Sequence, residues 1–508
     1  MRERDSNTKS LWQDLPLVWQ PANVAVDDAV YDVLIVGGGI TGLTTAVLLQ
    51  KAGKKCILAE AKNLGYGTSG GTTAHINTFF EASYKDIEKD FGEDAARLIA
   101  AAGTETLSMI KSLIDSHSID CDFQYKDAYL YAENDQEAKA LTEILASSRK
   151  AGISAVEVRE NKVPVPFQLS VLYSEQAQFH PLKYIYQLAE VFVKAGGIIL
   201  ENTFIRKTEF KEGVHFAESD LTTLKASNLV YATHLPPGIN LLDFRCAPYR
   251  SYVLGIKLKN EDYPDALIYD MQEPYHYFRT HEINGEKYLI LGGEDHKTGH
   301  DDPKKAFENL ASYARKYYYV STIAYQWSAQ FYVSADGLPY IGLLPGGDDR
   351  LYIATGYNGN GMTFGSLAGK MISDQILGIT NPYAELLSPS RIKPIAGFEE
   401  FVTENADVAY HFIADRLSAS AIDSLQEIMP GTGQIVKYKE EKLAIYKDMN
   451  GVVTALNPVC THAKCIVNFN PAEKSWDCPC HGGRYSITGE VLTGPPRRNL
   501  DRIPISDL

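Results

Sequence analysis

The spacing of apolar residues changes several times along the chain, and each change predicts a different kind of element. An apolar run over Tyr31–Val36 stops at Gly37, and helical spacing over Gly42–Ala52 leads to a second apolar run over Cys56–Glu60. Strand, helix and strand in this order indicate a βαβ unit. Helical periodicity then dominates from about residue 84 to 151, with one short strand-like stretch inside it.

The middle of the chain is rich in β-branched and aromatic residues, which favour strands. Four such stretches cover residues 250–259, 273–280, 286–293 and 324–333. Asn284-Gly285 supplies a two-residue hairpin turn between two of them. We therefore expect an antiparallel sheet beside the βαβ unit.

The C-terminal part of the chain has a third pattern. After Gly378, proline and serine interrupt both periods, which places a domain boundary near residue 400. A helix is predicted at 407–416. Short strands follow at 434–439, 443–448 and 452–457, with Asn450-Gly451 as a two-residue turn, so the last hundred residues predict a small β domain.

Length and charge exclude several classes of protein. The 508 residues, 45% hydrophobic and 22% charged, suit a folded protein with two or three cores. The net charge of −15 argues against nucleic acid or an anionic membrane surface as a partner. We expect no transmembrane segment, because no window approaches about 18 uninterrupted apolar residues. The N-terminus lacks an apolar leader, so a cytoplasmic location is predicted.

A dinucleotide-binding pattern lies at the first turn of the βαβ unit. Gly37, Gly39 and Gly42 form G-x-G-x-x-G between strand and helix, which permits a tight turn and a close approach to a pyrophosphate. Glu60 ends the second strand, where a carboxylate can accept hydrogen bonds from ribose hydroxyls. The glycines alone are a weak signal, but the whole arrangement predicts dinucleotide binding.

Other motifs resemble those of the D-amino-acid-oxidase-like superfamily of flavin-dependent oxidoreductases over about residues 30 to 380. They are Thr68–Ala74, Tyr231–His234, Asp336–Gly342 and Leu351–Thr363. The resemblance implies bound FAD, with the N-terminus of a late helix facing the isoalloxazine ring. The implied FAD contacts are Gly37, Gly39, Gly42, Glu60, Thr68, Ser69, Thr72, Thr73, Ala232, Thr233, Gly356, Gly361, Met362 and Thr363.

Two departures from that family bear on the substrate and on the flavin linkage. Where its amino-acid oxidases place an arginine, this chain has Gln330–Val333, so a simple α-amino acid is not expected. Where some relatives attach FAD covalently through a histidine, this chain has Gly71, with His75 four residues later. We expect non-covalent FAD and a small amine or related molecule as substrate.

Candidate pocket residues lie on the predicted strand at 273–280. Tyr275, Tyr277 and Arg279 alternate along it, so they share one face and could line a substrate pocket. The alternative is that the aromatic rings only pack within the sheet. His180 and His296 are interpreted as capping or surface histidines.

Four of the seven cysteines fall close together near the C-terminus. Cys460 and His462 form C-x-H, and Cys478 and His481 form C-x-x-H after fifteen intervening residues. Two thiolates and two imidazoles in this order suit a [2Fe–2S] cluster in which the cysteines bind one iron and the histidines the other. A zinc site with the same ligand types is the alternative.

The sequences around these motifs resemble those of the Rieske family, in its branch related to respiratory complexes. The resemblance extends over about residues 425 to 508. The resemblance implies a disulfide between Cys465 and Cys480. Neutral histidines in place of two thiolates are expected to raise the cluster potential and to expose a histidine edge to partners. The hydroxyl that bonds a bridging sulfide in this family falls at Gly483, whereas its tyrosine is kept as Tyr485. Loss of that hydrogen bond should lower the cluster potential.

These observations predict an α/β protein with a small all-β domain after it. The Rossmann-like FAD-binding domain would carry an inserted antiparallel-sheet substrate domain. We expect an N-terminal extension at residues 1–30 and the oxidoreductase domain at 31–395, with its substrate part mostly at 240–335. A linker with a helix would follow at 396–424, and the Rieske domain at 425–508.

The predicted activity is that of a dehydrogenase that oxidises a small amine. FAD would take two electrons, and the cluster would pass them singly to an acceptor protein or a quinone-like acceptor. Two alternatives stay open. One is a reductase that feeds an external oxygenase, which would need a second nucleotide site. The other is a redox sensor or docking protein that turns over no substrate.

Overall fold

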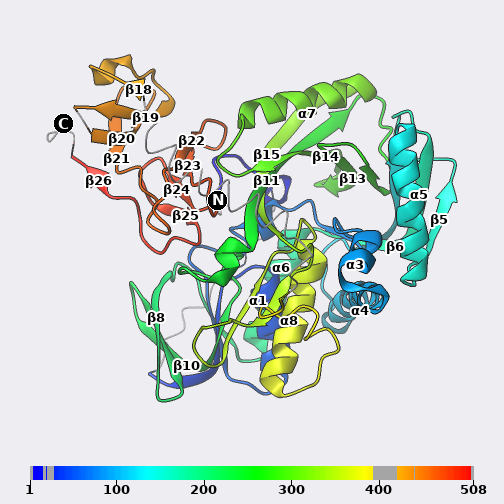
Figure 1. Ribbon diagram of the computed structural model, residues 1–508, viewed down its shortest axis with the longest axis horizontal. Helices are drawn as coiled ribbons and strands as arrows, with labels where there is room; N and C mark the ends of the chain where they lie inside the picture. Colours follow the sequence, from blue (N-terminus) through cyan, green and yellow to red (C-terminus); the bar gives the residue numbers. More distant parts are fainter. Residues whose placement is uncertain (1–3, 15–18, 20–27, 393–419, 440, 505–508) are drawn as a thin grey trace.

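The computed structural model describes residues 4–14, 19, 28–392, 420–439 and 441–504 (Figure 1). The helix predicted at 407–416 lies outside these residues. Among the described helices, none has the length and apolar character required to cross a membrane.

The predicted βαβ unit forms the centre of the first sheet. Strand β1 pairs in parallel with β2 and with β10, and helix α1 connects β1 to β2. The described sheet has the order β16-β17-β10-β1-β2-β7, with β8 and β9 added beside β10. The strands are β1 (Val30–Val36), β2 (Cys56–Ala59), β7 (Ile198–Leu200), β8 (Ile205–Lys211), β9 (Val214–Ser219), β10 (Thr223–Tyr231), β16 (Tyr340–Leu343) and β17 (Leu351–Thr355).

The second sheet contains all four stretches predicted in the middle of the chain. They form β11, β13, β14 and β15, and Asn284-Gly285 makes the predicted turn between β13 and β14. Strands from before residue 180 complete the sheet, so it extends beyond 240–335. Its strands are β3 (His75–Ile76), β4 (Gln124–Ala132), β5 (Ala155–Val158), β6 (Leu169–Gln178), β11 (Cys246–Leu258), β12 (Leu267–Asp270), β13 (His276–Ile283), β14 (Glu286–Lys297) and β15 (Val320–Ser334).

Helices cover both sheets. In the main core α1 packs against α6 and α8, while α7 packs on β11, β14 and β15 of the second sheet (Figure 1). The predicted helical region contains α3, α4 and α5, with β4 as its strand-like stretch. The helices are α1 (Ile40–Lys51), α2 (Thr68–Gly71), α3 (Tyr84–Phe91), α4 (Glu93–His117), α5 (Asp135–Lys150), α6 (Pro181–Lys194), α7 (Pro303–Tyr317) and α8 (Gly361–Leu377).

The C-terminal part forms two small sheets with cores of their own. The predicted strands are β19, β20 and β21. The turn at Asn450-Gly451 is longer than the predicted two residues, because Lys447 pairs with Val453 and leaves five residues between them. The strands are β18 (Ser420–Ala421), β19 (Thr432–Tyr438), β20 (Glu441–Lys447), β21 (Val453–Leu456), β22 (Asn468–Asn470), β23 (Ser475–Asp477), β24 (Arg484–Ser486), β25 (Val491–Thr493) and β26 (Arg502–Ile503).

The N-terminal segment joins the two parts of the chain. Leu11 and Trp12 are fully buried in the main core, so residues 4–14 are more than an extension. The Arg4 guanidinium donates to the Ser328 carbonyl oxygen of β15 over 2.5 Å, and Asp5 contacts Arg484 of the C-terminal part.

Candidate functional site

The turn between β1 and α1 requires its glycines. Gly37 has a φ of +114°, and a Cβ atom there would lie 2.4 Å from the Ala232 carbonyl oxygen. A Cβ atom on Gly42 would lie 2.0 Å from the Gly37 carbonyl oxygen. Glu60 accepts a hydrogen bond from the Gly38 amide over 2.6 Å, and burial raises the pKa of its carboxyl group. The chain therefore packs here as a dinucleotide turn requires.

A cavity of about 550 Å³ opens above this turn. Gly42, Gly356 and Thr363 lie outside its lining, and Thr73 lines a neighbouring cavity instead. Gly42 therefore serves the packing of the turn. The other predicted FAD contacts line the cavity: Gly37, Gly39, Glu60, Thr68, Ser69, Thr72, Ala232, Thr233, Gly361 and Met362.

The start of α8 faces the cavity, as predicted for the late glycine motif. Gly361 and Met362 begin the helix, so its backbone amides and positive dipole end point toward the space for the flavin. Gly356 has a φ of +72°, and a Cβ atom there would lie 3.0 Å from Ser334 Cβ. Thr363 donates its hydroxyl to the Asn77 carbonyl oxygen over 3.0 Å, which holds the helix beside the segment after β3.

The C-terminal domain supplies part of the same cavity, which the sequence did not predict. Residues 490–497 and Asn499 line it, together with Asp5 from the N-terminal segment. The Arg497 guanidinium donates to the Tyr231 hydroxyl over 3.1 Å at the end of β10. The Gly-Pro-Pro-Arg stretch at 494–497 indicates a rigid loop, but no local pattern identifies what that loop covers. The flavin cavity is therefore composite.

A second cavity of about 270 Å³ adjoins the first. The two share four lining residues, Thr68, Thr72, Phe331 and Gly359. Among the described residues that line the second cavity, none is a lysine or an arginine. A molecule held there would lie against the flavin end of the larger cavity, as a substrate must.

The structure separates the three predicted pocket residues. Tyr275 and Tyr277 line the second cavity. Arg279 shares their strand but lies outside the lining, fully buried, and its guanidinium donates to the carbonyl oxygens of Thr73 and Ala74 over 2.7 and 3.0 Å. Arg279 therefore holds the loop that contains Thr73 and Ala74 and does not line the second cavity.

The three histidines noted in the sequence have different places. His75 lines the second cavity, and burial lowers the pKa of its imidazole, whose Nε2 atom is shielded and makes no hydrogen bond within the described chain. His180 caps α6, where its Nδ1 atom accepts the Lys183 amide over 3.3 Å. His296 stacks on Tyr252. The capping interpretation thus holds for His180.

The four predicted cluster ligands come together in the C-terminal domain. Cys460 and Cys478 are buried, and a hydrogen bond from Cys478 holds the pKa of Cys460 below its usual value. The rings of His462 and His481 lie 5.0 Å apart, nearly perpendicular. Both Nδ1 atoms are buried without a hydrogen bond to the described chain. Free thiols and free imidazole nitrogens at one place fit the donor set of a [2Fe–2S] cluster.

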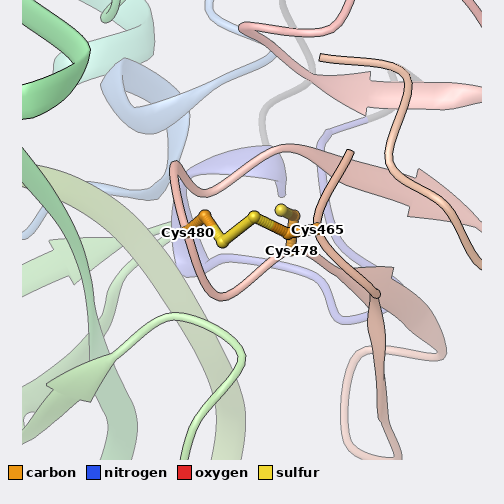
Figure 2. A group of neighbouring side chains, drawn as sticks. All are labelled: Cys465, Cys478 and Cys480. Atoms are coloured by element: carbon orange, nitrogen blue, oxygen red, sulfur yellow. A yellow bond between two sulfur atoms is a disulfide. The ribbon is translucent and has the colours of Figure 1, made fainter. Parts of the chain in front are cut away.

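A disulfide joins Cys465 and Cys480, as the resemblance implied (Figure 2). The sulfur atoms of these two residues and of Cys478 lie within 4.8 Å of one another. The two bonded sulfurs are not free to bind a metal, so Cys478 is the member of this group with a thiol that could bind an iron. The disulfide therefore braces the two loops that carry the ligands.

The histidine edge is not exposed, which corrects the expectation from the sequence. The side chain of His462 is 4% exposed, and its Nε2 atom donates to the Gly238 carbonyl oxygen over 3.2 Å. The same atom lies 3.6 Å from the Asp243 carboxylate. The Tyr332 hydroxyl donates to the His481 carbonyl oxygen over 3.0 Å. The edge is covered because the flavin domain docks on it.

The change at Gly483 has a steric cause. A Cβ atom there would lie 2.6 Å from Pro496 Cγ, so the loop that lines the flavin cavity occupies the space of a side chain. Tyr485 keeps its place, with its hydroxyl 3.2 Å from Cys460 Sγ and accepting the Thr461 amide over 3.0 Å. One of the two hydroxyl interactions near the cluster is therefore retained.

Comparison with known proteins agrees with this geometry. The family model for FAD dependent oxidoreductases, DAO, matches residues 32–375, and that for the Rieske [2Fe-2S] domain matches residues 419–504. The chain is 33% identical over 482 residues to YhfW of Bacillus subtilis (strain 168), which its name describes as a Rieske 2Fe-2S iron-sulfur protein, and the match covers 94% of each chain.

More distant likenesses cover the flavin part. Gamma-glutamylputrescine oxidoreductase of Escherichia coli (strain K12) is 24% identical and is matched over 71% of this chain and 87% of its own. Glycine oxidase from Geobacillus kaustophilus has the same fold, with a TM-score of 0.61 at 18% identity over 71% of this chain and 99% of its own. The chain therefore belongs to the DAO family of FAD-dependent oxidoreductases, carries a C-terminal Rieske domain, and has FAD and a [2Fe–2S] cluster as its cofactors.

Proposed function

We propose that this oxidoreductase removes two electrons from a small amine and passes them through the [2Fe–2S] cluster to an external one-electron acceptor. When bound, FAD would accept a hydride from the carbon atom next to the amine nitrogen. The observation that carries the proposal is strand β15, where neighbouring residues contact the substrate cavity, the flavin cavity and the cluster loop.

Phe331 on β15 lines both cavities. Its neighbours face the cluster. The Gln330 side-chain amide donates to the Gly482 carbonyl oxygen over 3.0 Å. The Tyr332 hydroxyl donates to the His481 carbonyl oxygen. On the flavin side, the Thr68 hydroxyl donates to the Gln330 carbonyl oxygen over 2.6 Å. A continuous hydrogen-bonded path therefore joins the flavin loop to a cluster ligand.

An amine substrate suits the cavity better than an amino acid. Gln330 begins the stretch where the family's amino-acid oxidases place a carboxylate-binding arginine, and its side chain is engaged by the cluster loop and by the Thr298 hydroxyl, which donates over 3.1 Å. No lysine or arginine lies among the described lining residues to replace it. A relative named for the oxidation of gamma-glutamylputrescine supports the same class of substrate.

The test is anaerobic stopped-flow with amines, followed by flavin absorbance and by the signal of the reduced cluster. Flavin bleaching should come first, and the reduced cluster should form as the flavin is reoxidised. Cys478→Ser should keep substrate-driven bleaching but lose most turnover with one-electron acceptors. Tyr319→Phe, at an exposed surface position, is the control and should behave as the wild type.

Three results would contradict the proposal. Turnover of Cys478→Ser at the wild-type rate would make the cluster structural. Bleaching by NADH or NADPH and by no amine would favour the reductase that feeds an oxygenase. Failure of every reductant to bleach the flavin at a catalytic rate would favour a sensor.

A further inference from the structure

We propose that the substrate is a diamine or longer polyamine without a carboxylate group, and that Asp295 binds the ammonium group that is not oxidised. This inference rests on the proposed amine oxidation and names its substrate class. Its observations are the charge of the second cavity, the state of Asp295, and the aromatic walls around it.

The lining of the second cavity is acidic. Glu81, Asp270, Glu273 and Asp295 belong to it. Asp270 is already engaged, because it accepts hydrogen bonds from the backbone amide of His276 over 2.7 Å and from its Nδ1 atom over 2.8 Å. Three carboxylates remain without a basic residue beside them in the described lining. Such a cavity attracts cations and repels the carboxylate of an amino acid.

Asp295 lacks the partners that a buried carboxylate needs. Both of its oxygens are shielded from solvent, and neither makes a hydrogen bond of normal geometry within the described chain. Burial raises the pKa of its carboxyl group to about 8, against the opposing influence of the Ser251 and Tyr275 hydroxyls. A buried carboxyl group is stabilised by a paired cation, and an ammonium group of the substrate would supply it.

Aromatic rings form the walls near this carboxylate. Tyr275 and Tyr277 lie with ring centroids 5.7 Å apart, and the Tyr277 hydroxyl is 2.7 Å from that of Ser251. Tyr277 lies against Gly292 of β14, where a Cβ atom would be 2.0 Å from its Cζ atom. A glycine there makes room for the ring, and ring faces add cation–π attraction for an ammonium group.

Glu81 lies where the second cavity adjoins the flavin cavity, and the Tyr275 hydroxyl interacts with both Glu81 and Asp295. A Cβ atom built on Gly359, which lines both cavities, would lie 3.6 Å from Glu81 Oε1 and 4.0 Å from the Tyr275 hydroxyl. The two carboxylates can therefore face two amino groups of one substrate. The amine that reacts gives its proton to Glu81, its neighbouring C–H bond breaks with transfer of a hydride to FAD, and water hydrolyses the imine to an aldehyde and an amine or ammonia.

The test uses the oxidised holoprotein and the flavin difference spectrum as a measure of binding. The probes are 1,4-diaminobutane, butylamine and 4-aminobutyrate, which share one carbon chain and differ in the distal group. We expect the diamine to bind about tenfold more tightly than butylamine or better, and 4-aminobutyrate to bind most weakly. The same order should hold for anaerobic bleaching.

Variants then locate the preference. Asp295→Asn should weaken diamine binding by about tenfold or more and leave butylamine within about twofold. Asp295→Glu, which keeps the charge, should retain the preference for the diamine. Glu282→Gln, at an exposed position of β13 outside the cavity lining, is the matched control and should keep the wild-type order. FAD and iron contents identify any variant that fails to fold.

The outcomes separate this inference from the proposed function. Tightest binding of 4-aminobutyrate, no spectral change with the diamine, or an unchanged preference in Asp295→Asn would overturn the diamine assignment while leaving the relay intact. A diamine that bleaches the flavin without reducing the cluster would instead refute the relay and leave the substrate class standing.

Discussion

The hydroxyl of Tyr332 donates a hydrogen bond over 3.0 Å to the backbone carbonyl oxygen of His481, a predicted cluster ligand. Tyr332 belongs to the same strand as Phe331, which lines both cavities. Tyr332→Phe should therefore slow electron transfer from flavin to cluster while leaving flavin reduction by substrate unchanged. Stopped-flow traces at the two absorbances measure both rates. Equal slowing of both steps would mean that the residue serves only the fold.

Asp243 should lower the potential of the cluster. Its carboxylate lies 3.6 Å from His462 Nε2, in a site where the Asp243 side chain is 1% exposed. A negative charge beside a ligand histidine stabilises the oxidised, more positive cluster. Asp243→Asn should raise the midpoint potential by on the order of 50 mV, about a tenfold change in the equilibrium constant for one electron. A redox titration monitored by electron paramagnetic resonance measures the midpoint potential of the cluster. An unchanged potential in the variant would refute the predicted effect of Asp243.

Asp5 should stabilise the contact between the two parts of the chain. Its carboxylate lies 3.3 Å from the fully buried Arg484, and the charges of Arg4 and Arg484 lower its pKa despite its burial. Asp5→Ala should cost about 3–5 kcal/mol of unfolding free energy, because it leaves buried guanidinium groups unpaired. Asp28→Ala, with its exposed pair to Lys225, is the control and should cost under about 1 kcal/mol.

The same pair predicts a pH dependence. Because the pKa of Asp5 is lower in the folded than in the unfolded chain, its contribution is present above the unfolded value of about 3.9 and is lost as pH falls through the folded one. Thermal unfolding should show a large difference between wild type and Asp5→Ala at neutral pH and a shrinking one in acid. A difference that stays constant down to pH 2 would contradict the assignment.

Diamine affinity should rise with pH. The pKa of Asp295 is raised to about 8, with Glu81 and Glu273 adding repulsion and the hydroxyls of Ser251 and Tyr275 opposing it. Below this value the carboxyl group is protonated and neutral, so a bound ammonium group must displace its proton. The diamine dissociation constant should fall by up to tenfold per pH unit between about pH 6 and 8. Glu81 faces the same substrate, and burial raises its pKa to about 7, so Asp295→Asn should reduce this slope without abolishing it. A slope in the variant equal to that of the wild type would contradict the role of Asp295.

The linkage of FAD remains a prediction from the sequence. His75 lines the substrate cavity and lies outside the lining of the larger one, while Gly71 stands where some relatives carry the attaching histidine. Acid precipitation should release all the yellow colour into the supernatant. Flavin that stays with the pellet would show a covalent bond, and peptide mapping would then identify its position.

Local patterns predicted most of the elements, and family resemblance supplied the candidate residues for both cofactors, which the structure brings together at two places. The turn at Gly37 depends on short-range geometry that leaves little freedom, whereas the pairing of Cys465 with Cys480 followed from the resemblance to the Rieske family. Contacts between segments that lie far apart in the sequence could not be predicted from these patterns. His462 meets Gly238 across 224 residues, and its coverage follows from domain docking, which no period or motif encodes. Arg279 shares a strand face with Tyr277, yet depth along the strand removes it from the cavity.

The composite wall of the flavin cavity sets an order on maturation. Residues 490–497 close the cavity from the C-terminal side, and Pro496 of this stretch also fills the space beside Gly483 in a cluster loop. A newly made chain would have to admit its flavin before or during the seating of this stretch, which Pro496 brings against the cluster loop. We therefore expect a chain that lacks its cluster to exchange its flavin more freely than the complete protein does.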